Sequence, residues 1–188
     1  MNVAVITPKS MKHPRQFPLL ALFVLIAAGC TPKSNMPFTP RPEDPWFVRT
    51  HFADDAKWNA LVAAASAPIK MSGNEYFANF NPVDNAKHTG MSPLDVVNAL
   101  PDDYPQYFVL VGDALSHGDN PTVLVVNFLP QFDESYETLP RERTETHVES
   151  FRAAPDTLQS ITNNLSISNM GFEEFAESVD DDGVFRGF

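Results

Sequence analysis

The hydrophobic and polar positions of residues 46–188 follow patterns that predict a β-sheet with helices packed on it. Residues 46–52 alternate between apolar and polar side chains, which predicts a strand whose solvated face carries Arg49 and His51. A second, short strand is predicted at 76–80, where aromatic residues and alanine share one face.

The two most apolar segments, 107–111 and 123–126, are continuous runs of β-branched, leucine and aromatic residues. Such runs are typical of strands that are covered on both faces. The link between them, 112–121, has only ten residues, which is at the short limit for a crossover helix. We therefore expect antiparallel neighbours in the middle of the sheet. A more polar strand is predicted at 145–152, at an edge.

Helical periodicity accounts for most of the remaining apolar residues. The stripe from Trp58 to Ala65 follows Asp54 or Asp55 as N-cap and ends before Pro68. Ser92 and Pro93 begin another helix, since serine is a good N-cap and proline suits the first helical position. The fold class is α/β, or α+β: a single-domain mixed β-sheet with about four packed helices. The last three helices are predicted at 92–100, 156–165 and 172–179.

The N-terminal region has the order of an export signal. Lys12 and Arg15 precede an apolar run of ten residues, Leu19–Ala28, which is half of the roughly 20 that a bilayer span needs. The run ends at AAGC, which resembles the lipobox of bacterial lipoproteins. By that resemblance Cys30 is diacylated on its sulfur, residues 1–29 are then removed, and the new amino terminus is acylated in turn, palmitate included. Met1 and Met11 are alternative start residues of the chain. The alternative interpretation of the segment is an ordinary secretory signal with an incidental cysteine.

The segment after Cys30 predicts a spacer. Residues 30–45 contain five prolines, and proline restricts the backbone to extended conformations. At about 3.1 Å per residue in polyproline geometry, 31–45 would reach roughly 45 Å from the membrane. The predicted organisation is a signal peptide (1–29), a lipidated cysteine with a tether (30–45) and one domain (46–188). The location expected is the cell envelope, on the periplasmic face of the outer membrane in a Gram-negative organism.

The charge of the chain limits its partners. The formal net charge is −11, and removal of 1–29 takes away three cations and no acid, which leaves −14. Such a polyanion is repelled by nucleic acids and by anionic lipid surfaces. The lipid on Cys30 must therefore supply the membrane contact, and the expected macromolecular partner is a basic protein. Because Cys30 is the only cysteine, no internal disulfide can form. The sequence does not indicate an oligomeric state.

Candidate chemistry is sparse. The sequence lacks the common nucleophile-elbow, zinc-protease and phosphate-loop motifs, so no catalytic residue and no cofactor is predicted. The weak metal candidates are Asp113, His117 and Asp119, which lie between the two most buried strands. The alternative interpretation of that segment is a solvated loop. The acidic end, SVDDDGVF, is not an EF-hand because the required glutamate would fall beyond Phe188.

Isolated histidines and arginines are expected to be structural or solvated. His51, His88 and His147 each stand among polar residues. The basic residues of the C-terminal half are expected to bind a carboxylate ligand or, more simply, to neutralise glutamates nearby in sequence. These arginines are Arg141, Arg143 and Arg152, and the glutamates are Glu142, Glu145 and Glu149.

Three phrases carry a family resemblance. NNLSISNMGFEEFA and DDGVFRGF close the chain, and FVRTHFADDAKW opens the domain at 47–58. They resemble an uncharacterised family of small acidic bacterial domains with the pattern NNLSI-x-NM-x-FEEFA and DGVFRGF, and the resemblance spans most of 46–188. The chain departs from the family at His51, where an acid is expected, and in its signal and tether. No catalytic residue is assigned in that family, so none is transferred.

These observations favour a membrane-anchored bacterial lipoprotein with a non-catalytic protein-binding module. A structural envelope lipoprotein is one alternative. The other is a metal-dependent hydrolase that uses the Asp113, His117 and Asp119 loop, although the sequence leans against an enzyme.

Overall fold

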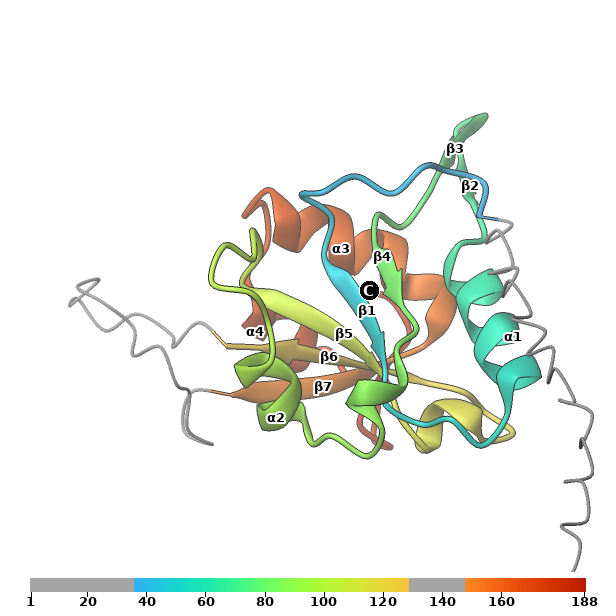
Figure 1. Cartoon of the computed structure of the whole chain (residues 1–188). Coiled ribbons are helices and arrows are strands. Elements are labelled where there is room, and N and C mark those ends of the chain that lie inside the picture. Colours follow the sequence, from blue (N-terminus) through green and yellow to red (C-terminus); the bar gives the residue numbers. More distant parts are fainter. Residues whose placement is uncertain (1–35, 129–147) are drawn as a thin grey trace, which may run out of the picture. The chain divides into compact units, whose positions relative to one another are not determined.

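The computed structural model describes residues 36–128 and 148–188, which form two β-sheets and four α-helices (Figure 1). The strands are β1 (Trp46–Arg49), β2 (Ile69–Met71), β3 (Asn74–Tyr76), β4 (Asn81–Val83), β5 (Phe108–Gly112), β6 (Val123–Asn127), β7 (Glu149–Ala153) and β8 (Val184–Phe185). The α-helices are α1 (Asp55–Ala65), α2 (Pro93–Asn98), α3 (Leu158–Ser166) and α4 (Phe172–Ala176), and 3₁₀ helices span Ala86–His88, Leu115–His117 and Pro155–Thr157.

The main sheet is mixed, with the strand order β4-β1-β5-β6-β7-β8. β1 is parallel to β4 and β5, β6 is antiparallel to β5 and β7, and β8 is parallel to β7. Five strands therefore end at one side of the sheet, here called the carboxyl edge, and begin at the amino edge. The predicted fold class, a mixed sheet with about four packed helices, is confirmed.

The centre of the sheet follows the sequence prediction. β5 and β6 are antiparallel neighbours, with Val109 opposite Val126, and every residue of both strands is buried. The faces are covered by two hydrophobic clusters. One cluster contains apolar residues of α1, α3 and α4, and the other contains Val96 and Val97 of α2. Burial on both faces explains why these strands lack polar alternation.

The first two helices begin where capping chemistry predicts. The Asp54 side chain accepts from the backbone N–H of Lys57, and Ser92 forms a capping box with Asp95. Trp58 of α1 lies directly over Gly112. A Cβ on Gly112 would stand 2.6 Å from the Trp58 ring, so glycine allows this close approach of helix and strand.

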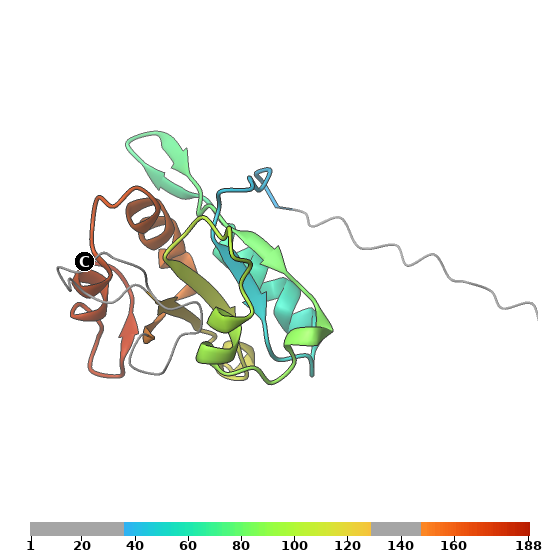
Figure 2. The ribbon, with the colours of Figure 1, turned by 60° about the vertical axis from the view of Figure 1, so that its left-hand side comes forward.

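The structure corrects the predicted role of β1. This strand lies between β4 and β5, with clusters on both of its faces, so it has no solvated face. Arg49, expected in water, is 2% exposed. The strand predicted at 76–80 is also wrong, because β3 ends at Tyr76 and β4 begins at Asn81. A two-stranded hairpin, β2–β3, occupies the sequence before this segment and projects from the sheet (Figures 1 and 2).

The C-terminal half differs from the prediction in three further ways. β7 is not an edge strand, because β8 pairs with Arg152 and Ala153. The predicted helix at 156–165 begins as the 3₁₀ turn Pro155–Thr157, and the last helix ends at Ala176 rather than near Val179. Phe188 contacts the rings of other phenylalanines but remains 75% exposed.

Part of the predicted tether packs on the domain. Met36 and Phe38 lie against the main cluster, and the Phe38 ring is 6.4 Å from that of Phe77. The Asn81 amide donates to the carbonyl oxygen of Arg41 over 2.6 Å. Residues 36–45 are therefore not a free spacer, while 31–35 lie outside the described residues.

The helices within 36–128 and 148–188 include none with the length and apolar character needed to cross a membrane. The predicted anchor and signal, 1–30, lie outside the described residues.

Candidate functional site

The carboxyl edge of the sheet contains a topological switch point. From β1 the chain passes through α1 to β4 on one side, and from β4 it passes through α2 to β5 on the other. In open α/β sheets the crevice at such a point is the usual place for a ligand. The segments that meet here are Arg49–His51 after β1, Asp84 after β4 and the loop 113–122 after β5.

Arg49 is the central side chain at this point. Its guanidinium donates from Nη2 to Asp55 over 2.8 Å, from Nη1 to Asp84 over 3.3 Å and from Nε to the carbonyl oxygen of His51 over 2.9 Å. It also lies over the Phe52 ring, 4.4 Å from the centroid. All three donor nitrogens are thus engaged, so Arg49 joins β1 to α1 and to the turn after β4. Alternation along 46–52 gave no sign of this burial.

The candidate Asp113 is held by protein partners. Arg152 forms an ion pair with its carboxylate, and the backbone N–H groups of Leu115 and Ser116 donate to it. Burial alone raises the pKa of Asp113, but the hydrogen bond and charge of Arg152 outweigh it and hold that pKa below its usual value. Arg152 therefore neutralises Asp113 on a distant strand end, and not a glutamate nearby in sequence as predicted. Arg141 and Arg143 lie outside the described residues.

His117 lies in the same loop but has a different environment. Its ring packs edge-on against His51, with centroids 4.9 Å apart, and is 7% exposed. Neither of its ring nitrogens has a hydrogen-bond partner among the described residues, whereas its carbonyl oxygen accepts from Lys57 Nζ over 2.7 Å. Burial, followed by the charges of His51 and Arg49, lowers the pKa of His117. His117 is therefore held neutral at physiological pH.

The structure brings together fewer of the candidate residues than a metal site needs. Asp113 is engaged by Arg152, His117 faces His51, and Asp119 is exposed. Residues 36–128 and 148–188 contain no group of three His, Cys, Asp or Glu side chains arranged to hold a metal ion. The metal site stays a prediction that this geometry does not favour.

The other histidines differ from expectation. His51 is not alone, since its ring contacts His117, and His88 is 2% exposed with Nδ1 unpartnered in the described part of the chain. Burial lowers the pKa of His88, with a smaller contribution from Lys87. His147 lies outside the described residues.

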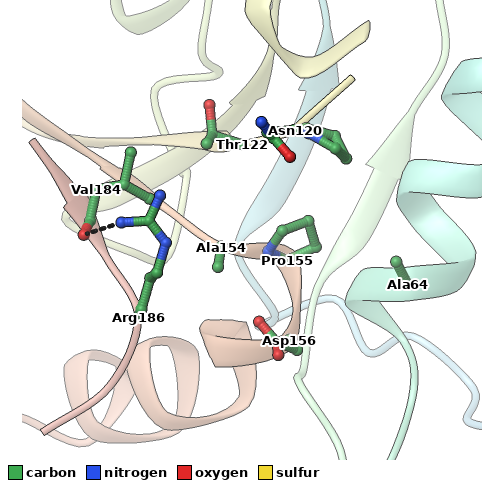
Figure 3. Close-up of a pocket in the computed structure, with 9 residues that line it drawn as sticks. Ala64, Asn120, Thr122, Ala154, Pro155, Asp156, Val184 and Arg186 are labelled. Carbon is green, nitrogen blue, oxygen red and sulfur yellow. Dashed lines mark hydrogen bonds between the residues drawn. The ribbon is translucent and has the colours of Figure 1, made fainter. Parts of the chain in front are cut away.

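A groove opens at the carboxyl edge beside α1, with a volume of about 440 Å³ (Figure 3). Pro121, Pro155 and Val184 supply apolar surface, while Asp156 and Arg186 carry charge. The volume lies in the range of small-ligand sites, but the groove is open to solvent. The complete lining is Ala64, Asn120, Pro121, Thr122, Ala154, Pro155, Asp156, Val184 and Arg186.

The acidic C-terminal turn binds the groove's arginine. Arg186 donates to Asp180 over 2.8 Å and to Asp182 over 2.7 Å. The Arg186 hydrogen bond is the main cause of the lowered pKa of Asp182. The acidic turn thus holds the Arg186 side chain between Asp180 and Asp182, an arrangement here called the Arg186 clamp. The carboxylates of Asp181, Asp156 and Asp119 are exposed.

Residues 44–188 match the family model described as Domain of unknown function (DUF6924). The chain belongs to this family. The match covers the domain in which the sequence resemblance was found, and it includes the buried Arg49, the His117 loop and the acidic turn. No curated protein and no solved structure matches this DUF6924 member.

The two buried histidines predict acid sensitivity of this DUF6924 domain. Well above pH 6.5, the usual histidine pKa, both imidazoles are neutral in the folded and unfolded chains. As the pH falls below that value, the unfolded chain binds protons first because its pKa is higher, so the free energy of unfolding decreases. Urea unfolding between pH 7.5 and 5.5 measures this loss. We expect His117→Gln and His88→Gln each to remove part of it, and a double variant with the wild-type slope would contradict the assignment.

Proposed function

We propose that this chain is a bacterial lipoprotein, anchored in the cell envelope through acyl chains on Cys30, whose DUF6924 domain is a non-catalytic module that binds a basic protein partner. The anchor is supported by the order of charge, ten apolar residues and cysteine at 12–30. Two or more acyl chains hold a protein stably, because each buried methylene contributes about 0.8 kcal/mol.

The distribution of charge around the groove is the observation that supports the binding role. Asp156 lines the groove and is exposed, while Asp180 and Asp182 stand beside it. Arg186 is the cation in the lining, and its guanidinium is already paired with these two aspartates. A lysine or arginine of a partner would therefore meet uncompensated carboxylate charge.

The surface of the groove also suits a protein contact. Proline, alanine and valine side chains form its apolar part, and the polar part of the lining is Asn120, Thr122, Asp156 and Arg186 (Figure 3). Protein interfaces likewise combine apolar and polar surface. At the mature charge of −14, electrostatic steering would raise the association rate with a basic partner by roughly 10- to 1,000-fold at low salt.

The anchor predicts a mass change at Cys30. The full chain, expressed in a bacterium that processes lipoproteins, should lose residues 1–29, incorporate labelled palmitate and partition into membranes. Cys30→Ser removes the thiol that accepts the lipid, so it should abolish palmitate incorporation and membrane retention. Intact mass spectrometry and membrane fractionation measure both, with Ser34→Ala as a matched control outside the cleavage site. Cleavage without acylation would instead indicate an ordinary secretory signal.

The groove predicts a specific covalent adduct in the native envelope. A photoreactive benzoylphenylalanine at Asn120 should give one discrete adduct in the bacterium that encodes the chain. The same residue at Ala99, at the end of α2 on the opposite face of the sheet, should give none. Asp156→Lys should reduce the Asn120 adduct several-fold by charge repulsion, whereas Asp103→Lys should not.

Equal labelling from both positions, or an adduct unaffected by Asp156→Lys, would contradict the binding role. A complete lack of adducts from an acylated protein would favour the structural lipoprotein instead.

A further inference from the structure

The point where the chain enters the domain limits how far the domain can stand from the bilayer. Met36 and Phe38 pack against the main cluster. Five residues, 31–35, separate Met36 from Cys30, and an extended chain spans at most about 3.6 Å per residue. The six steps from Cys30 to Met36 therefore span at most about 22 Å, less than the 35 Å or so across a domain of this size.

The entry point lies at the amino edge of the sheet. Phe38 contacts Phe77, which directly follows β3, and Phe80, which directly precedes β4. The Asn81 backbone N–H, where β4 begins, donates to the carbonyl oxygen of Pro45 over 2.8 Å. The short connection to Cys30 consequently favours an orientation with the amino edge toward the membrane and the carboxyl edge away from it.

The β2–β3 hairpin forms a separate two-stranded sheet at this edge, with one mainly apolar face. Ile69 is opposite Tyr76 and Met71 is opposite Asn74, so these four residues share that face. Met71 is 56% exposed and Tyr76 is 38% exposed. The other face carries Lys70 and Glu75, which form an ion pair and leave no net charge.

Two more exposed apolar residues lie at the amino edge. Tyr107 immediately precedes β5, and Ile167 follows α3, whose Asn163 donates to the carbonyl oxygen of Phe77. The hairpin itself projects beyond the sheet in both views (Figures 1 and 2). Met71, Tyr76, Tyr107 and Ile167 are thus four of the six large apolar residues exposed in the described part of the chain. The other two are Leu115, in the loop at the carboxyl edge, and Phe188.

We propose that the apolar face of the β2–β3 hairpin lies in the interface of a neutral phospholipid bilayer and orients the domain on the membrane. This proposal rests on acylation of Cys30. The hairpin stays at headgroup depth, because its two open edges expose backbone groups that hydrocarbon cannot satisfy. Tyrosine suits this depth, with an apolar ring and a polar hydroxyl. A bilayer rich in anionic lipid is excluded as the preferred surface by the mature charge of −14.

The test uses the full acylated chain in phosphatidylcholine vesicles. Because Cys30 is the sole cysteine and its thiol is blocked by lipid, Asn74→Cys introduces a single site for an environment-sensitive fluorophore beside Met71. We expect blue-shifted emission and quenching by lipids brominated near the headgroup. The same label at Asn120→Cys, on the carboxyl edge, should show neither. Adding Met71→Ser and Tyr76→Ser should abolish the shift at position 74 without releasing the protein from the vesicles.

Each outcome separates the two proposals. Water-like emission at position 74 in a protein that sediments with the vesicles would overturn the hairpin contact and leave the lipid anchor intact. Equal shifts at positions 74 and 120 would also overturn it. A protein without acyl chains that does not sediment with vesicles would overturn the anchor and this proposal together. Unchanged thermal unfolding of the serine double variant would show that the domain core is intact.

Discussion

The parallel pairing of β1 with β4 on one side and β5 on the other is the constraint on which the rest of the structure depends. This pairing places β1 inside the sheet, so Arg49 at the end of β1 is buried. A buried guanidinium requires partners, and Asp55 and Asp84 supply them. These contacts fix the start of α1 and the end of β4, and thereby the switch point beside which the His117 loop lies.

Local patterns predicted the elements whose partners are close in sequence or whose burial is uniform. β5 and β6 are uninterrupted apolar runs, and α1 and α2 have caps that act within a few residues. The surroundings of β1 and β7 depend instead on distant strands. Nothing in the alternation of 46–52 shows that β4 will cover that strand, and β8, which covers β7, has only two residues.

The sequence predicted a polar loop between the two most buried strands, and the structure places this loop, 113–122, at the carboxyl edge. A site in that loop stays a prediction. The pairing of the loop, however, comes from Arg152, 39 residues away, and from His51 after β1. The sequence also did not indicate that Arg186 pairs with the acidic turn. Three adjacent aspartates suggest a metal cation as ligand, whereas the cation in the structure is the Arg186 side chain, four residues after Asp182.

The two edges of the sheet carry different surface features. The amino edge receives the chain from Cys30 and carries the β2–β3 hairpin with its exposed methionine and tyrosine. The carboxyl edge carries the groove, Asp156 and the acidic turn. In the arrangement that we propose, the hairpin faces the bilayer and the groove faces a partner.

Hydrogen–deuterium exchange tests this orientation most directly, by comparing the acylated chain on phosphatidylcholine vesicles with the unacylated Cys30→Ser chain in solution. The account predicts slower exchange on vesicles for the amides of 69–76 and no change for 119–122 or 180–183. Slower exchange at the groove or the acidic turn, with the hairpin unchanged, would contradict it.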